Sequence, residues 1–332
     1  MTSQSTFSTS ERPSGSDLPA SSGTVTISHG TDDKRLRLGP LGLARAAWGT
    51  VYESVWMHRA LVGNFARREL KAKYKGSVLG SLWSMVNPLA TLGVYTLIFG
   101  FFLKFQPPTA GNGHLHNFAI YLFTALVCWN MFFGLLTGTM GSLIAAGGLL
   151  RKVYFPASAP VFGAALATLN QTAIEMGLLI VAYILLGNIS WTVLFVPFFL
   201  ILLFAFSLGA GLALSVVNAR YRDVAYLVSI WLQLMFYMEP IVYPKSQIDA
   251  HIKGFQTSDV HQTIGTAPAH PWLHIYYWNP LTQFIEAFRN CFYDLKIPSW
   301  ENFVSLTIWS FGLLAVGWWL FERGAREVAE EL

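Results

Sequence analysis

Hydrophobic residues in this sequence gather into long stretches separated by short polar segments. A helix needs about 20 apolar residues to cross a hydrocarbon core of about 30 Å. We predict that each stretch of this length forms a membrane-spanning helix. The five such stretches are residues 82–103, 118–144, 161–186, 191–217 and 303–321.

A sixth apolar stretch is shorter and runs from Val224 to Met238. Its fifteen residues span only about 22 Å as a helix. The segment therefore either recruits the residues up to Tyr243 or stops at a broken, partly re-entrant end. We count residues 224–243 as a span, so the sequence predicts an all-α integral membrane protein with six transmembrane helices.

The basic residues indicate the orientation of these spans. Lys and Arg concentrate in cytoplasmic loops of membrane proteins. With both termini inside, 17 of the 22 basic residues are cytoplasmic. The outside keeps only Lys104, Lys245, Lys253, Arg289 and Lys296.

An amphipathic helix is expected just before the first span. On a helical wheel its basic residues fall within an arc of roughly 100°, and apolar residues such as Phe65 and Leu70 take much of the opposite side. This pattern suits a helix at the membrane surface or against a cytoplasmic partner. The alternatives are a solvated first turn of the span or charge that only sets topology. The basic residues of this face are Arg67, Arg68, Lys71 and Lys75.

The remaining segments complete the expected organisation. Residues 1–33 are rich in Ser, Thr, Gly and Pro, which predicts a disordered cytoplasmic tail. Residues 34–80 form the interface-helix region, residues 81–325 the transmembrane domain, and residues 322–332 a cytoplasmic C-terminus.

The external segment 239–301 is expected to contain short helices. Leu281, Phe284, Ile285 and Phe288 recur at helical spacing, which predicts a helix that dips into the outer leaflet. The aromatic run that ends at Trp278 also suits an interfacial belt.

Composition excludes several classes of protein. Charged residues make up 12% of the chain, against about 25% in soluble proteins. The net charge of +4 lies at the ends of apolar segments and forms no nucleic-acid surface. Two cysteines and dispersed histidines fit neither a disulfide framework nor a metal site. No phosphate-binding loop or catalytic motif occurs, so we expect neither enzyme activity nor a cofactor in this chain.

Glu175 is the only acidic residue well inside a predicted span. A charge there is costly unless it faces a polar path or a partner. Gln171, four residues earlier, shares its helix face. A structural interhelical hydrogen bond and a lining role on a route for polar cargo both remain open.

Aromatic residues recur at helical spacing in the first and fifth spans. Such stripes are commonly core packing or lipid contact, but ring faces can also let sugars slide through a tunnel. The residues concerned are Tyr95, Phe99 and Phe102 in the first span and Trp231, Gln233 and Tyr237 in the fifth.

Several motifs together resemble the type-2 ABC exporter permeases that move lipid-linked polysaccharide, such as O-antigen, teichoic acid and cell-wall galactan. The similarity covers about residues 55–325. It begins with R-E-L-K-x-K-Y-K-G-S-V-L-G-S-L-W from Arg68. Two positions depart from the family pattern: Lys73 stands where arginine is usual, and Glu239 replaces a small or hydroxyl residue. Further pieces are Asn87-Pro88, residues 152–156 (KVYFP), 218–223 (NARYRD) and 240–244 (PIVYP), Asn279-Pro280 and Phe288-Arg289.

The resemblance implies a homodimeric permease in the bacterial cytoplasmic membrane, assembled with two copies of a separate ATPase that binds ATP and magnesium. It implies a sugar tunnel at the dimer axis, with Glu175 and the aromatic stripes as candidate lining. Gate helices would lie between spans five and six, with Pro240, Tyr243, Pro244, Asn279, Pro280 and Arg289 as gate residues. The ATPase would be coupled through the basic helix face and through Arg151, Lys152, Tyr154, Phe155, Pro156, Arg220, Arg222 and Asp223.

Other functions remain open on the sequence. A related permease could export a small hydrophobic compound. An ATP-independent channel, a secondary transporter or a membrane enzyme is the alternative of a different class.

Overall fold

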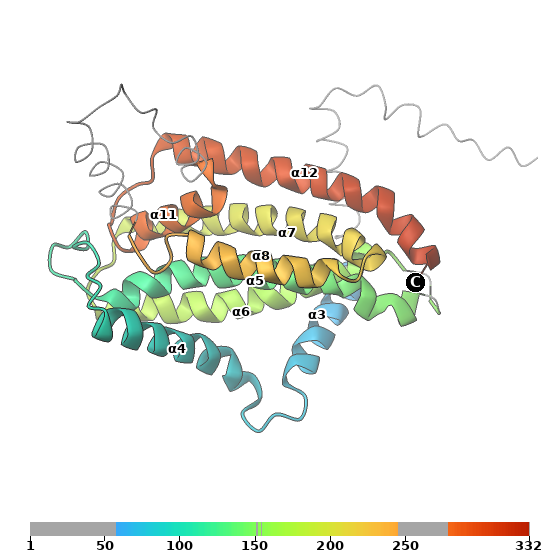
Figure 1. Ribbon diagram of the computed structural model, residues 1–332, viewed down its shortest axis with the longest axis horizontal. Helices are drawn as coiled ribbons and strands as arrows, with labels where there is room; N and C mark the ends of the chain where they lie inside the picture. Colours follow the sequence, from blue (N-terminus) through green and yellow to red (C-terminus); the bar gives the residue numbers. More distant parts are fainter. Residues whose placement is uncertain (1–57, 151, 154, 245–277, 332) are drawn as a thin grey trace, which may run out of the picture. The chain divides into compact units, whose positions relative to one another are not determined.

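The computed structural model describes residues 58–150, 152–153, 155–244 and 278–331, and all regular secondary structure in these ranges is helical. The all-α prediction is therefore confirmed for the described part of the chain (Figure 1). Residues 1–57 and 245–277, to which we assigned the tail, the start of the interface-helix region and part of the external segment, lie outside it. The helices are α3 (Arg59–Tyr74), η1 (Gly80–Leu82), α4 (Trp83–Tyr95), η2 (Thr96–Phe102), α5 (Phe118–Leu150), α6 (Ser158–Leu185), η3 (Trp191–Phe195), α7 (Val196–Arg220), α8 (Val224–Met238), α11 (Pro280–Phe292) and α12 (Trp300–Glu331).

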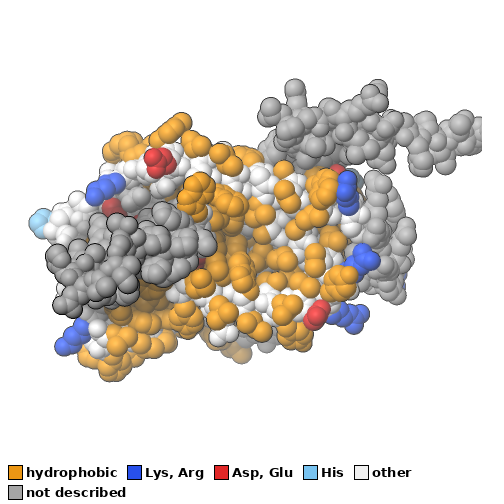
Figure 2. All heavy atoms as spheres, turned by 45° about the horizontal axis from the view of Figure 1, so that its top comes forward, with side chains coloured by type: hydrophobic (Ala, Val, Ile, Leu, Met, Phe, Trp, Pro, Cys, Tyr) orange, Lys and Arg blue, Asp and Glu red, His pale blue; other side chains and the backbone are white. Residues whose placement is uncertain are grey.

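Five helical segments of the described chain are long and apolar enough to cross a membrane, so the protein is a multi-pass membrane protein. Hydrophobic side chains dominate the face shown in Figure 2, and the charged side chains seen on it lie toward two opposite ends. The five segments are Gly80–Phe102, Phe118–Leu149, Ser158–Leu185, Trp191–Arg220 and Trp300–Ala325. They correspond to the five long apolar stretches of the sequence.

The sixth apolar helix, α8, ends at Met238 and does not continue to Tyr243. Glu239 has an extended backbone (ψ 149°), and the next residue is Pro240, which disfavours a helical conformation in the residue before it. Of the two alternatives left by the sequence, the structure has the broken end.

The first span also differs from the continuous α-helix expected there. Residues Thr96–Phe102 form a π-helix, with wider turns than the α-helical segment before them. The expectation that Tyr95, Phe99 and Phe102 share one face assumed α-helical spacing and is wrong for Phe102. That ring is 67% exposed, whereas Tyr95 and Phe99 are half-buried and stack with a centroid distance of 5.9 Å.

Helix α5 lies at the centre of the helical bundle. It packs against both α6 and α7, and 78% of its most apolar window is buried, compared with 6% for the span Gly80–Phe102. Helix α7 also packs along α12, and α3 packs against α6. The core is therefore formed by α5, α6, α7, α11 and α12, with α4 and α8 at its margin.

Helices α7 and α12 approach so closely that glycine is required on both. A Cβ atom on Gly317 would overlap the Gly209 carbonyl, and one on Gly209 would lie 2.5 Å from the Leu314 amide nitrogen, closer than van der Waals contact allows. Small residues allow helix backbones to approach in this way inside membranes. We call this close contact of α7 and α12 at Gly209 and Gly317 the glycine seam. It holds α12 against the core.

Candidate functional site

Helix α3 presents two different faces. Val62, Phe65 and Ala66 are buried, and the Phe65 ring lies 5.4 Å from that of Phe155. The apolar side packs on α6 at Gly163, where a Cβ atom would meet Phe65. The candidate basic residues Arg67, Arg68, Lys71 and Lys75 are exposed.

A turn joins this helix to the first span. Helix α3 ends at Tyr74, and Gly76 and Gly80 both adopt positive φ angles, of 76° and 52°. L-residues rarely adopt this conformation, whereas glycine does so without steric cost. The two glycines thus allow the chain to reverse between the basic helix and the membrane span.

A polar network inside the bundle connects α3 with three further helices. Gln171 donates to the Ser84 carbonyl at 2.7 Å and to the Glu175 carboxylate at 2.9 Å. Asn130 donates to the other Glu175 oxygen at 3.0 Å, and the Tyr74 hydroxyl donates to Gln171 at 3.4 Å. Glu175 is 3% exposed. The interhelical hydrogen bond that the sequence left open is therefore present.

The candidate gate residues come together where the chain leaves α8 and enters α11. Asn279 caps α11 by accepting from the Leu281 amide at 3.0 Å, and Pro280 occupies the first turn. The Tyr243 hydroxyl donates to the carbonyls of Tyr237 and Met238, at 3.0 and 2.9 Å. Pro240 and Pro244 are buried at this junction. Both helix ends are thus capped by residues predicted to form a gate.

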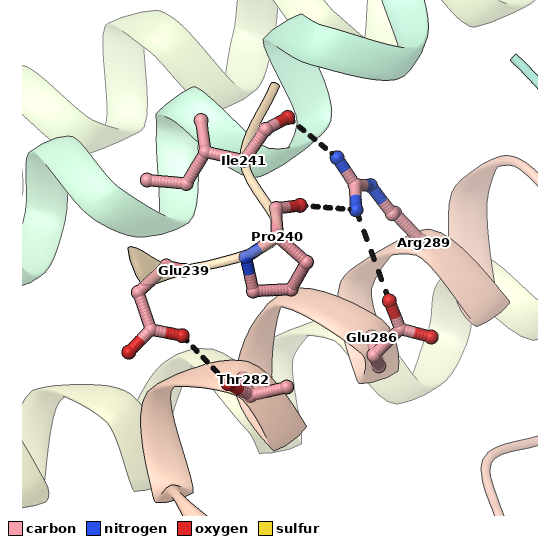
Figure 3. A network of polar contacts seen from close by, with 6 residues as sticks. All are labelled: Glu239, Pro240, Ile241, Thr282, Glu286 and Arg289. Atoms are coloured by element: carbon pink, nitrogen blue, oxygen red, sulfur yellow. Dashed lines mark hydrogen bonds and ion pairs between the residues drawn. The ribbon is translucent and has the colours of Figure 1, made fainter. Parts of the chain in front are cut away.

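Arg289 fastens α11 to the end of α8 (Figure 3). Its guanidinium donates to the carbonyls of Pro240 and Ile241 and lies 3.8 Å from a Glu286 carboxylate oxygen. It also lies 3.8 Å from the ring centroid of Tyr121 on α5. Arg289 is only 2% exposed, and its positive charge is compensated inside the protein by two carbonyl oxygens, a carboxylate and the face of an aromatic ring.

Glu239 and Thr282 were not recognised as site residues from the sequence. Glu239 is fully buried and accepts hydrogen bonds from Asn279 and, at 2.7 Å, from the Thr282 hydroxyl. Its carboxylate thus lies at the N-terminus of α11, where the partial positive charge of the helix stabilises an anion. The departure of Glu239 from the family pattern was the only sequence signal, and its partners lie some 40 residues away.

The aromatic candidates form no single stripe. Tyr95 contacts Phe236 of α8, with ring centroids 5.6 Å apart. Trp231, Gln233 and Tyr237 of α8 are exposed. The structure thus brings Tyr95 to α8, where its side chain also hydrogen-bonds with that of Tyr237, while Trp231 and Gln233 make no contact of this kind with it.

The candidate coupling loops differ in how much of them is described. Lys152 is exposed, and Phe155 and Pro156 are half-buried. Arg220, at the end of α7, and the following Arg222 and Asp223 are exposed. Arg151 and Tyr154 lie outside the described residues. Across the described ranges, no three His, Cys, Asp or Glu side chains group as metal ligands.

The chain is similar to known transport proteins along most of its length. Residues 61–257 match the ABC-2 type transporter family. The O-antigen export system permease protein RfbA of Myxococcus xanthus is 26% identical over 84% of this chain and 97% of that protein. RfbA of Klebsiella pneumoniae is 29% identical over 80% and 92%. The polysialic acid transport protein KpsM of Escherichia coli is 23% identical over 67% and 77%.

Proposed function

This chain belongs to the ABC-2 type transporter family, and from that premise we propose that it is the membrane permease of an ATP-driven polysaccharide exporter. The observation that carries the proposal is the alignment of most of the chain with export permeases for O-antigen and with a polysialic acid transport protein. The cargo is a lipid-linked polysaccharide, and ATP and magnesium bind to a separate ATPase subunit.

Deletion of the gene in its own host tests this proposal. Export is expected to stop, so lipid-linked polysaccharide should accumulate on the cytoplasmic side, detected by surface labelling before and after permeabilisation. A plasmid that encodes the wild-type chain should restore export. Normal surface polysaccharide in the deletion strain would contradict the proposal, and loss of resistance to a small hydrophobic compound would favour the alternative cargo.

The proposed assembly is a homodimer with two ATPase copies. Helix α8 is its fifth span, shortened by the break at Glu239, and both termini are cytoplasmic in the bacterial cytoplasmic membrane. The exposed basic face of α3 and the loops around Lys152 and Arg222 contact the ATPase. The junction of α8 and α11 forms the external gate.

A cysteine in place of Lys152 tests the orientation. An impermeant thiol reagent should label it only after intact cells are permeabilised, because the loop is cytoplasmic in the proposed topology. The native Cys128 and Cys291 are buried and should contribute little background. A cysteine at exposed His114, in the external loop before α5, should label without permeabilisation. If the cysteine at position 114 is labelled only after permeabilisation and the one at position 152 without it, the orientation is opposite to the proposed one.

Gly163→Ala should uncouple the ATPase from transport. The added methyl group would meet Phe65, so α3 must shift away from α6, and overpacking of this kind costs about 1–3 kcal/mol. We expect ATP hydrolysis by the assembled complex to persist while export falls severalfold. Gly177→Ala on the same helix is the matched control, since its Cβ would meet nothing within 4 Å. Equal export by both variants would show that the packing of α3 against α6 does not couple ATP hydrolysis to export.

Replacing aromatic residues of the first span tests the sugar path. Tyr95→Leu and Phe99→Leu should reduce export, because stacking on sugars needs a flat polarisable ring. Expression, dimer assembly and basal ATP hydrolysis should stay near wild type, and Phe99→Trp should retain more export than Phe99→Leu. If the leucine variants export normally, the rings serve only to pack α4 against α8.

A further inference from the structure

A groove of about 1050 Å³ lies between α11 and the first half of α12. It has a polar and an apolar end along α12. The first turns of this helix contribute Glu301 and Ser305, and later turns contribute Ile308, Leu313 and Val316. From Glu301 to Val316 the helix rises by about 22 Å.

The apolar part of the groove faces away from the protein core. Ile308 is 67% exposed and Val316 is 53% exposed, and both belong to the candidate membrane span Trp300–Ala325. Within a bilayer, these side chains contact hydrocarbon. The polar end lies at the start of the span, where a membrane helix meets the headgroup region. A molecule that fills the groove therefore needs one polar head and a hydrocarbon tail.

The charges at the polar end select the type of head. Glu286 and Glu301 both line the groove, and no Lys or Arg of the described chain does. Glu301 lies in the first turn of α12 and offsets the partial positive charge of the helix start. The guanidinium of Arg289 is buried, donates to the Pro240 and Ile241 carbonyls and lies 3.8 Å from a Glu286 carboxylate oxygen. It therefore offsets the charge of Glu286, and Glu301 supplies most of the negative charge at the polar end.

Tryptophan side chains strengthen the preference for a cation. Trp278 and Trp300 line the groove and are 69% and 78% exposed. Indole faces attract ammonium groups through the negative potential above the ring. Together with the Glu301 carboxylate, they disfavour an anionic head such as a polyprenyl diphosphate.

We propose that this groove binds a phospholipid with an ammonium headgroup, such as phosphatidylethanolamine, with its acyl chain along Ile308 and Val316. The groove borders the proposed external gate, since Thr282 of α11 lines the groove and also donates to Glu239, but the Glu301 carboxylate disfavours the diphosphate that carries a lipid-linked glycan. The proposal does not depend on which polymer is exported.

Native mass spectrometry of the full chain tests this site. Detergent-solubilised protein is mixed with equal amounts of phosphatidylethanolamine and phosphatidylglycerol of matched acyl chains. The wild-type chain should retain phosphatidylethanolamine in preference. Glu301→Gln should bring the ratio of the two retained lipids closer to one, because it removes one carboxylate without changing the shape of the groove.

A second variant fills the groove instead. Gly312 lines it, and a Cβ atom there would meet nothing within 4 Å, so Gly312→Leu adds a side chain at the wall of the groove. This variant should lower phosphatidylethanolamine retention severalfold, whereas Gly177→Leu, on α6, should leave it unchanged.

Three results would overturn the proposal. They are equal retention of both lipids by the wild-type chain, unchanged phosphatidylethanolamine retention in Gly312→Leu, and displacement of bound phosphatidylethanolamine by an equal amount of polyprenyl diphosphate.

Discussion

Arg289→Ala is expected to lower the free energy of unfolding by about 3–5 kcal/mol, the usual cost of removing one partner from a buried charged network. The substitution leaves the Pro240 and Ile241 carbonyls without the donors that Arg289 supplies. Irregular backbone at membrane depth is tolerated only where its polar groups are satisfied or reach water. We therefore expect the α8–α11 junction to open and export to be lost.

Thermal unfolding of the purified chain in detergent and an export assay in cells measure these effects. Arg289→Lys should be intermediate, because one ammonium cannot reproduce the planar fork that serves two carbonyls. Arg323→Ala is the matched control. Arg323 also lies over a ring, 4.0 Å from the Trp319 centroid, but it is exposed. Equal melting temperatures for Arg289→Ala and Arg323→Ala would refute a structural role for the buried cation.

Gly317→Ala should have an equally large effect on folding. Its new methyl group would overlap the Gly209 carbonyl of α7. Because the obstacle is backbone, relief requires the two helices to separate along a seam where they otherwise pack closely. Overpacking costs about 1–3 kcal/mol where side chains can adjust, and here the cost should exceed that range.

Gly312→Ala on the same helix is the control for this substitution. A Cβ atom at Gly312 has open space around it, and alanine is favoured over glycine inside a helix by about 0.5–1 kcal/mol. We expect Gly312→Ala to yield monodisperse protein at wild-type level or above, and Gly317→Ala to aggregate or express poorly on size-exclusion chromatography. Similar yields from both would show that the seam can relax.

The long spans were predictable because length and hydrophobicity are local properties. Each of the five long apolar stretches corresponds to a helix that can cross the membrane. The end of α8 was predictable in part, since Pro240 lies two residues after the apolar run, which ends at Met238. The sequence pattern of a segment was sufficient to predict its structure wherever that structure does not depend on contacts with other segments.

The candidate site depended on contacts that no local pattern contains. Glu239 is held by Asn279 and Thr282, and Gly317 is matched to Gly209 more than 100 residues earlier. Glycines at such a seam look like ordinary span glycines until the partner helix is placed. The motifs did identify Asn279, Pro280 and Arg289 as a set, but not the carbonyls and ring to which Arg289 binds.

The π-helix at Thr96–Phe102 gives the first span an unusual tolerance to changes in chain length. A π-helical turn accommodates an extra residue within an α-helical path. Removal of one residue from this segment can restore α-helical pitch while Trp83–Tyr95 keep their positions. The same deletion in the middle of α5 would turn every following side chain by about 100° and misplace the core. Natural insertions and deletions within the spans should therefore concentrate in residues 96–102.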